Sequence, residues 1–204
     1  PSDTWSANVN SRYEGATREW RHGASGEFNA GRVNSLTTVQ MTDAKALHLD
    51  GEESSIGTAY ANSSRSVKER ITVRATDDVK ITGRAGYFYR ERRKSNSQHE
   101  RYRDADGGVR ANWNIGHDQQ LEVAYSFDQY DKSDYAVVTR QDVRDYSNRQ
   151  NIGRALYNLA WSDARSQVTV GGDVMNDFKA GNELGTSPKA QLVGQAIGGI
   201  LGSL

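Results

Sequence analysis

The chain has 204 residues, with 26 Lys and Arg against 26 Asp and Glu, so its formal net charge is +0. This balance gives no support to binding of nucleic acid or another polyanionic macromolecule. The absence of cysteine excludes disulfide frameworks, thiol nucleophiles and cysteine-ligated metals. Only 35% of residues are hydrophobic, yet there are 10 Tyr and 4 Trp. These numbers are typical of many half-apolar strands rather than of a disordered chain or a large soluble core.

No apolar run reaches the roughly 18 residues that a membrane-spanning helix requires. The first residues, 1–5, lack the basic and apolar regions of a secretory signal peptide. We therefore expect that the sequence begins after a processing site or inside a longer gene product.

Period-two alternation predicts β-strands along most of the chain. The clearest case is residues 121–130, where Leu121, Val123, Tyr125 and Phe127 alternate with polar or small residues. Such a strand has one apolar and one polar face. The strands predicted in this way cover 4–14, 24–30, about 39–41, about 67–74, 79–89, 109–113, 121–130, 155–161 and 168–174.

The predicted connections alternate in length. Short turns are expected at 31–34, 76–78, 116–118 and 162–165, and longer polar loops at 15–21, 48–54, 91–101 and about 131–146. Short turns at one end and long loops at the other are typical of outer-membrane barrels. Aromatic residues near the ends of the strands, such as Trp5 and Trp113, favour the same interpretation because aromatic girdles lie at membrane interfaces.

Together these patterns predict an all-β fold, an antiparallel up-and-down transmembrane β-barrel that is partial, with roughly nine strands over residues 1–178. A narrow soluble barrel with its apolar side chains inside remains an alternative, because alternation alone does not say what the apolar face meets.

Residues 179–204 break the alternation. Ser187 and Pro188 are a suitable N-cap and first helical residue, and Leu192, Ala196 and Ile200 then follow at helical spacing. We predict a linker followed by a short C-terminal amphipathic helix, with a glycine-rich disordered tail as the alternative.

Several segments resemble TonB-dependent outer-membrane receptors of the haem and siderophore type. The segments are 1–10, which is similar to the entry into the barrel just after the plug domain, and 87–92, 127–135, 142–147 and 169–173. The resemblance covers about residues 1–178. It implies a 22-stranded barrel plugged by an N-terminal domain, of which this sequence matches the first part of the barrel only, without a plug or C-terminal strands.

This resemblance implies a function in uptake of an iron carrier such as haem or a siderophore, which would be a transported ligand and not a resident cofactor. The expected location is the outer membrane, and the expected partners are outer-membrane lipid and the remaining barrel strands or a second chain. TonB would be a partner only of the intact receptor. An open sheet has two unpaired edges, which lipid does not tolerate.

Candidate ligand-binding residues lie in the segments expected to form outside loops. A haem receptor would use an outside His or Tyr as axial ligand, and cationic side chains would meet propionates or an anionic siderophore. The candidates are His48, Arg92, Arg93, His99, Arg101 and Tyr102. A solvated loop, or one bound to lipopolysaccharide phosphates, is the alternative. No metal site is predicted, since the aspartates between 128 and 145 lack EF-hand spacing.

The sequence contains no Gly-x-Ser-x-Gly, Walker or His-Glu-x-x-His motif, so we do not expect an enzyme. Two further hypotheses stay open beside the receptor. One is a soluble or self-assembling β-sheet protein, natural or engineered, whose edges or C-terminal helix mediate association. The other is an outer-membrane adhesin or pore.

Overall fold

The computed structural model describes residues 4–48, 58–116, 118–160, 167–181 and 187–193. All of the regular structure in these residues is β-strand. The strands are β1 Thr4–Glu14, β2 Glu19–Ala30, β3 Val33–Ala44, β4 Leu47–His48, β5 Thr58–Ala59, β6 Asn62–Arg74, β7 Val79–Arg93, β8 Gln98–Asn114, β9 Gln119–Ala136, β10 Gln141–Ala160, β11 Gln167–Gly181 and β12 Ser187–Val193.

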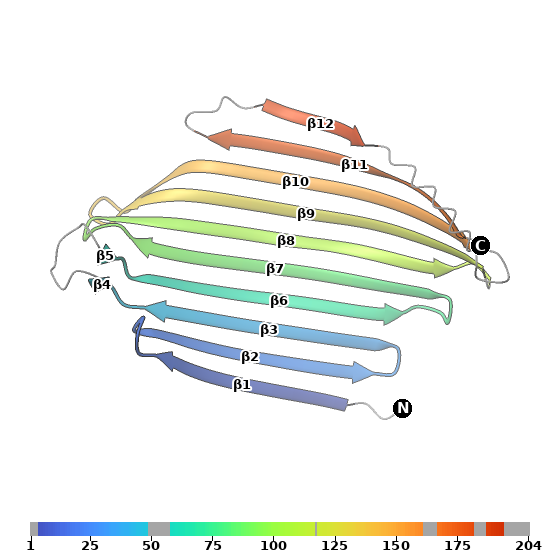
Figure 1. Ribbon diagram of the computed structural model, residues 1–204, viewed down its shortest axis with the longest axis horizontal. Coiled ribbons are helices and arrows are strands. Elements are labelled where there is room, and N and C mark those ends of the chain that lie inside the picture. Colours follow the sequence, from blue (N-terminus) through green and yellow to red (C-terminus); the bar gives the residue numbers. More distant parts are fainter. Residues whose placement is uncertain (1–3, 49–57, 117, 161–166, 182–186, 194–204) are drawn as a thin grey trace, which may run out of the picture.

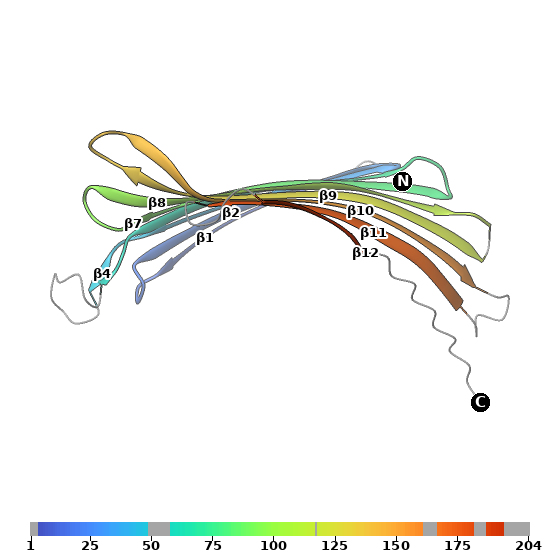
Figure 2. The same ribbon diagram turned by 90° about the horizontal axis from the view of Figure 1, so that it is seen from above.

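Ten strands form one antiparallel sheet in which every strand pairs with its neighbour in the chain, in the order β1-β2-β3-β6-β7-β8-β9-β10-β11-β12 (Figure 1). The short strands β4 and β5 pair with each other within the connection between β3 and β6. The sheet is bent and twisted, as Figure 2 shows, and its first and last strands do not pair with each other among the described residues. The predicted all-β class and the antiparallel pairing of the strands are confirmed.

The register assigns each strand two faces. Tyr125 lies opposite Val109 on β8 and opposite Gly153 on β10, and directly paired residues share a face of a sheet. The same reasoning continues across the sheet. We call the face that carries Val109, Val123 and Tyr125 the apolar face, and the opposite one, with Arg110 and Ser126, the polar face.

The apolar face is exposed. No hydrophobic residue among the described residues is buried, and Trp5 is 79% exposed, Val9 81% and Val123 49%. The large exposed hydrophobic side chains, apart from Val138 and Val143 near the hairpin tip at 137–140, belong to this face by the register. In the part of the chain that the structure describes, this face therefore packs against no dry protein core.

Glu69 interrupts the apolar face. Its carboxylate accepts a hydrogen bond of 2.6 Å from the hydroxyl of Ser35 and another from the hydroxyl of Thr37, which lies opposite it on β3. These side chains form a small polar patch beside Val39 and Val67.

The predicted loop at 91–101 is wrong, because β7 and β8 continue through it and leave only a four-residue tip at 94–97. The predicted loop at about 131–146 is also wrong, since β9 and β10 extend to a tip at 137–140. Cross-strand ion pairs explain why these segments are strands. Their charged side chains suggest a solvated loop in the sequence, but on paired strands they lie beside side chains of opposite charge. A bulge shifts the register between Arg144 and Tyr146.

The turn predicted at 31–34 is shorter than expected, because β2 ends at Ala30 and β3 begins at Val33. The turn predicted at 116–118 lies where expected, between the end of β8 at Asn114 and the start of β9 at Gln119. Gly31 and Gly116 both adopt positive φ, at 53° and 78°, which glycine allows without strain. The predicted turn at 162–165 lies outside the described residues. We call the end of the sheet with the tips 94–97 and 137–140 the tip end, and the end with the turns 31–32 and 75–78 the turn end.

The expected C-terminal helix is wrong for its first seven residues, which form β12 and pair with β11 from Ser187 opposite Lys179 to Val193 opposite Asp173. A free strand edge offers this segment hydrogen bonds that an isolated, glycine-rich helix lacks. Pro188 is tolerated because β12 is an edge strand. Residues 194–204 lie outside the described residues. The expected boundary after residue 178 falls inside β11, so the sheet continues to Val193.

No helix with the length and hydropathy to cross a bilayer occurs in the part of the chain that the structure describes.

Candidate functional site

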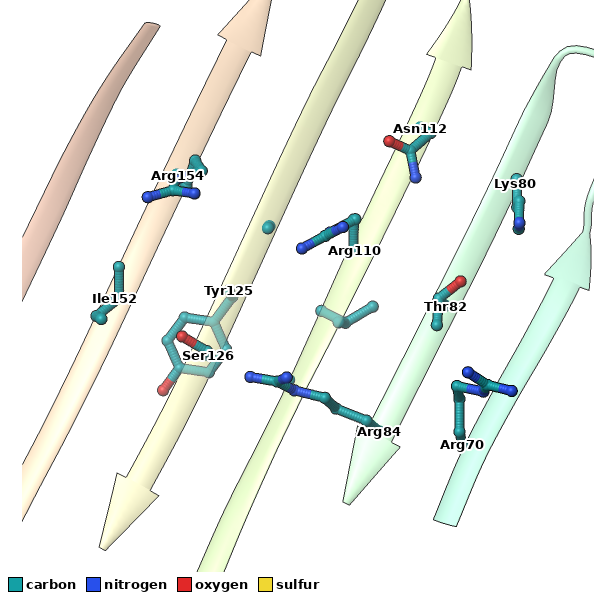
Figure 3. Close-up of a pocket in the computed structure, with 13 residues that line it drawn as sticks. Arg70, Lys80, Thr82, Arg84, Arg110, Asn112, Tyr125, Ser126, Ile152 and Arg154 are labelled. Atoms are coloured by element: carbon teal, nitrogen blue, oxygen red, sulfur yellow. The ribbon is translucent and has the colours of Figure 1, made fainter. Parts of the chain in front are cut away.

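A hollow of about 480 Å³ lies on the polar face, over the middle of β6 to β10. Five cationic side chains from four strands line it, together with the polar side chains of Thr82, Asn112 and Ser126 (Figure 3). We call it the cationic hollow. Its cations are Arg70 on β6, Lys80 and Arg84 on β7, Arg110 on β8 and Arg154 on β10.

Strand register gathers these side chains. Arg70 lies opposite Arg84, and Arg84 lies opposite Gly108, while Arg154 lies opposite Ala124. Gly108 and Ala124 leave space above the middle strands because they carry little or no side chain. Figure 3 shows Arg84 and Arg110 reaching sideways from β7 and β8 toward β9. The small residues on the middle strands therefore form the floor of the cationic hollow, and the long cationic side chains form its walls.

The cations of the hollow differ in their partners. Arg154 makes two hydrogen bonds to the carboxylate of Asp173, at 2.7 Å and 3.0 Å. Arg110 lies 3.7 Å from Glu122, at the limit of an ion pair. Among the described residues, no carboxylate lies within ion-pair distance of Arg70, Lys80 or Arg84. The hollow thus carries a local excess of positive charge although the whole chain is neutral.

A second feature lies at the tip end of the apolar face, which we call the hairpin cluster. The carboxylate of Glu91 is 2.6 Å from Nδ1 of His99 and accepts a hydrogen bond of 2.8 Å from Arg101. Arg101 also lies 3.2 Å from Asp142, and Arg103 donates to Asp142 at 2.5 Å. The guanidinium of Arg101 stacks on the ring of Tyr135 at 3.4 Å from its centroid.

These contacts shift the ionisation of the acids. Partial burial opposes the ionised form of Glu91, but hydrogen bonds from Tyr89, His99 and Arg101 outweigh it and lower the pKa of Glu91. In the same way burial opposes ionisation of Asp142, and hydrogen bonds from Ser133, Arg103 and Arg101 lower its pKa. The hairpin cluster is therefore a closed set of charge pairs.

A matching network lies on the polar face of the same hairpins. Glu100 is only 5% exposed and is surrounded by Lys94 at 2.9 Å, Arg92 at 3.2 Å and Lys132 at 3.6 Å. The hydroxyl of Tyr102 donates to it at 2.9 Å. Burial opposes ionisation of Glu100, but the hydrogen bonds from Lys94 and Tyr102 and the nearby cations lower its pKa. The buried carboxylate ties three strands together.

The structure divides the sequence-predicted ligand residues between the two faces. His99 and Arg101 lie in the hairpin cluster, while Arg92 and Tyr102 contact Glu100 on the other side of the sheet. His48 lies on β4, opposite Thr58. Most of these residues already hold protein partners, so they do not converge on one open site.

Arg93 and His99 do share a smaller hollow of about 250 Å³ at the tip end of the apolar face. Trp20, Arg18 and Lys45 also line it. The ring of Trp20 stacks on that of His22, with centroids 5.7 Å apart, and contacts Tyr13 at 4.9 Å. This hollow combines an aromatic wall with cations near a strand end.

The described residues hold no group of His, Asp or Glu arranged to bind a metal ion. The aspartates between 128 and 145 belong instead to β9 and β10, and two of them form ion pairs with Arg103 and Lys132.

The cationic hollow was not among the residues singled out from the sequence. Its signal was present as arginines that recur at positions opposite the apolar alternation, for example Arg84 and Arg110. What the sequence lacks is the register, which decides that arginines on separate strands lie side by side.

The fold and this hollow define an open antiparallel β-meander with one apolar face and one polar face, the middle of which is cationic. No protein-family model matches the sequence, and comparison with curated proteins gave no match.

Proposed function

We propose that this sheet is part of the wall of an outer-membrane receptor or transporter for an iron carrier such as haem or a siderophore. The apolar face would meet lipid and the polar face would line a hydrated passage. The observation that carries the proposal is the exposed apolar face, combined with the absence of any buried hydrophobic residue among those described. An exposed apolar surface of this extent normally marks contact with a membrane or another protein.

The dimensions support contact with a bilayer. On β7 the apolar side runs from Val79 to Tyr89, after which Glu91 begins the hairpin cluster. Ten steps along a strand cover about 33 Å, which corresponds to about 25 Å of membrane height at the usual tilt of 35–45°. The apolar band of outer-membrane barrels has this height. The charged hairpin ends of β7 to β10 would then project into water.

The edges of the sheet define what the proposal requires. β1 and β12 each have one side without a partner among the described residues. Lipid does not tolerate such edges, because water cannot satisfy their backbone groups there. The remaining barrel strands, or a second chain, would therefore close the wall. Coupling to TonB would belong to the intact receptor.

The choice of an iron carrier as ligand rests on the sequence resemblance described above. In this mechanism the hairpin ends capture the ligand and the polar face conducts it. Among the sequence-predicted residues, His99 is the axial-ligand candidate, and it would have to give up its 2.6 Å contact with Glu91 to bind iron through Nδ1.

A comparison of the full chain with and without lipid vesicles tests the membrane assignment. We expect β-structure, measured by circular dichroism, and protease protection of the strands only when vesicles or detergent are present. A detergent-free, monodisperse monomer with the same β-content would contradict the proposal.

The self-assembling sheet remains the second candidate, because the same exposed face would also be covered if two copies packed face to face. Sedimentation in water distinguishes the two functions. A discrete, soluble dimer or larger species without lipid favours self-assembly, whereas vesicle-bound chain with no discrete soluble species favours the receptor wall.

A further inference from the structure

We propose that the cationic hollow binds a compact multivalent oxyanion, of phosphate or carboxylate type, on the polar face of the sheet. This inference goes beyond the proposed function, because it depends on the local register of β6 to β10 and holds whether the apolar face meets lipid or a second copy. It also concerns a different face of the molecule from His99.

The first argument is uncompensated charge. Each charged arginine in the hairpin cluster has a carboxylate partner at 3.2 Å or less. In the cationic hollow, by contrast, Arg70, Lys80 and Arg84 have no carboxylate within ion-pair distance among the described residues. Like charges held on neighbouring strands repel one another. An anion between them would remove this repulsion and supply the missing partners.

The second argument is the chemistry of the donors. Guanidinium groups present paired N–H donors that match the oxygen atoms of phosphate and carboxylate groups. Three arginines, Arg70, Arg84 and Arg110, come from three adjacent strands and line the same hollow (Figure 3). Thr82, Asn112 and Ser126 add neutral hydroxyl and amide groups that hydrogen-bond to oxygen atoms.

The third argument is size and shape. The volume of about 480 Å³ falls in the range of small-molecule sites, roughly 300–1,000 Å³. Gly108 lines the hollow and has no side chain to fill it, and the backbone of β9 approaches so closely that a Cβ atom there would come within 2.7 Å of the backbone oxygen of Tyr125. Toward the tip end the same face becomes acidic, with Asp104, Asp106 and Asp128, and Asp106 lies opposite Asp128. This acidic border limits the ligand to a compact anion.

Titration calorimetry of the full chain in detergent tests the site, with inorganic tripolyphosphate and citrate as probes. We expect saturable binding of one probe molecule per chain that weakens steeply with added salt, because screening acts on charge attraction. Arg84→Gln should weaken binding at least tenfold, which corresponds to about 1.4 kcal/mol. Arg84→Lys keeps the charge but loses the paired donors, so it should lie between the wild type and Arg84→Gln.

Arg12→Gln is the matched control, because Arg12 is exposed on the polar side of β1 and, among the residues that the structure describes, forms an ion pair only with Glu14. It removes the same charge from the same face, far from the hollow, and should leave the affinity within twofold. Absence of saturable binding, or equal weakening by Arg12→Gln and Arg84→Gln, would overturn the proposal. Circular dichroism of each variant separates loss of the site from loss of the fold.

The two proposals fail separately. Binding of tripolyphosphate by a chain that does not insert into vesicles would contradict the receptor wall and leave the anion site standing. Insertion into vesicles without binding of tripolyphosphate would contradict the anion site and leave the receptor wall standing.

Discussion

Replacement of Val123 by arginine tests whether the apolar face contacts lipid or water. Val123 lies in the apolar stretch of β9, between Ala111 and Ala155 on the neighbouring strands, and is 49% exposed in the sheet alone. Burial of a whole valine side chain contributes about 1.5–3 kcal/mol, so lipid contact over the exposed half contributes roughly 1 kcal/mol. Arginine at mid-membrane costs about 2–4 kcal/mol.

The lost valine contact and the cost of arginine add up to roughly 3–5 kcal/mol. We therefore expect Val123→Arg to lower the folded-to-unfolded ratio in vesicles by about 140- to 3,700-fold, at about 1.4 kcal/mol per factor of ten. Gln40→Arg is the control, because Gln40 is exposed on the polar face of β3, away from the cationic hollow. It should change stability by less than about 0.5 kcal/mol.

The assay is urea unfolding of the full chain in lipid vesicles, followed by tryptophan fluorescence. Equal midpoints for Val123→Arg and Gln40→Arg would refute the reasoning, because they would mean that both faces meet water.

Glu69→Gln should raise the urea midpoint in vesicles, because lipid penalises the charge of the Glu69 carboxylate; a lower midpoint in vesicles would contradict lipid contact at this patch. Glu91, Glu100 and Asp142 have lowered pKa values in the folded chain, so their contribution to stability is complete above the unfolded values, 4.5 for Glu and 3.8 for Asp, and is lost as the pH falls through the lower folded values. Amide protection factors at the hairpin ends, which correct the exchange rate for its intrinsic pH dependence, should fall on acidification from about pH 5 to about pH 2, and unchanged protection factors would show that these acids do not hold the hairpins. Addition of haemin to the full chain should shift the Soret band, and His99→Ala should abolish the shift; a shift that survives in the variant would remove His99 as the axial ligand.

The sequence predicted most of the strands, since alternation is a local signal that each strand carries by itself. The strand at Thr4–Glu14 matches the expected bounds, and the strand beginning at Val79 begins where expected. The polar hairpin ends were mistaken for loops because Glu100 and its cationic partners look like solvated residues until the ladder brings them together.

The prediction of a C-terminal helix is wrong for a related reason. Helical spacing of Leu192 and its neighbours is a local pattern, but the edge of β11 supplies backbone partners that no local pattern contains. The cationic hollow depends on register in the same way, because Arg70 and Arg84 are distant in sequence and opposite in the sheet. Local alternation predicts which residues share a face of a strand, whereas the residues that meet in one site are known only from the pairing of the strands.

Spin-label accessibility along β9 tests the central claim most directly. The chain has no cysteine, so single cysteines can be placed at positions 120–127 and labelled one at a time. In vesicles we expect odd positions, with Val123 and Tyr125, to be accessible to oxygen, which concentrates in lipid, and even positions, with Ser126, to a water-soluble nickel reagent. If the odd positions were shielded from both reagents, the apolar face would be packed against protein and the account would be wrong.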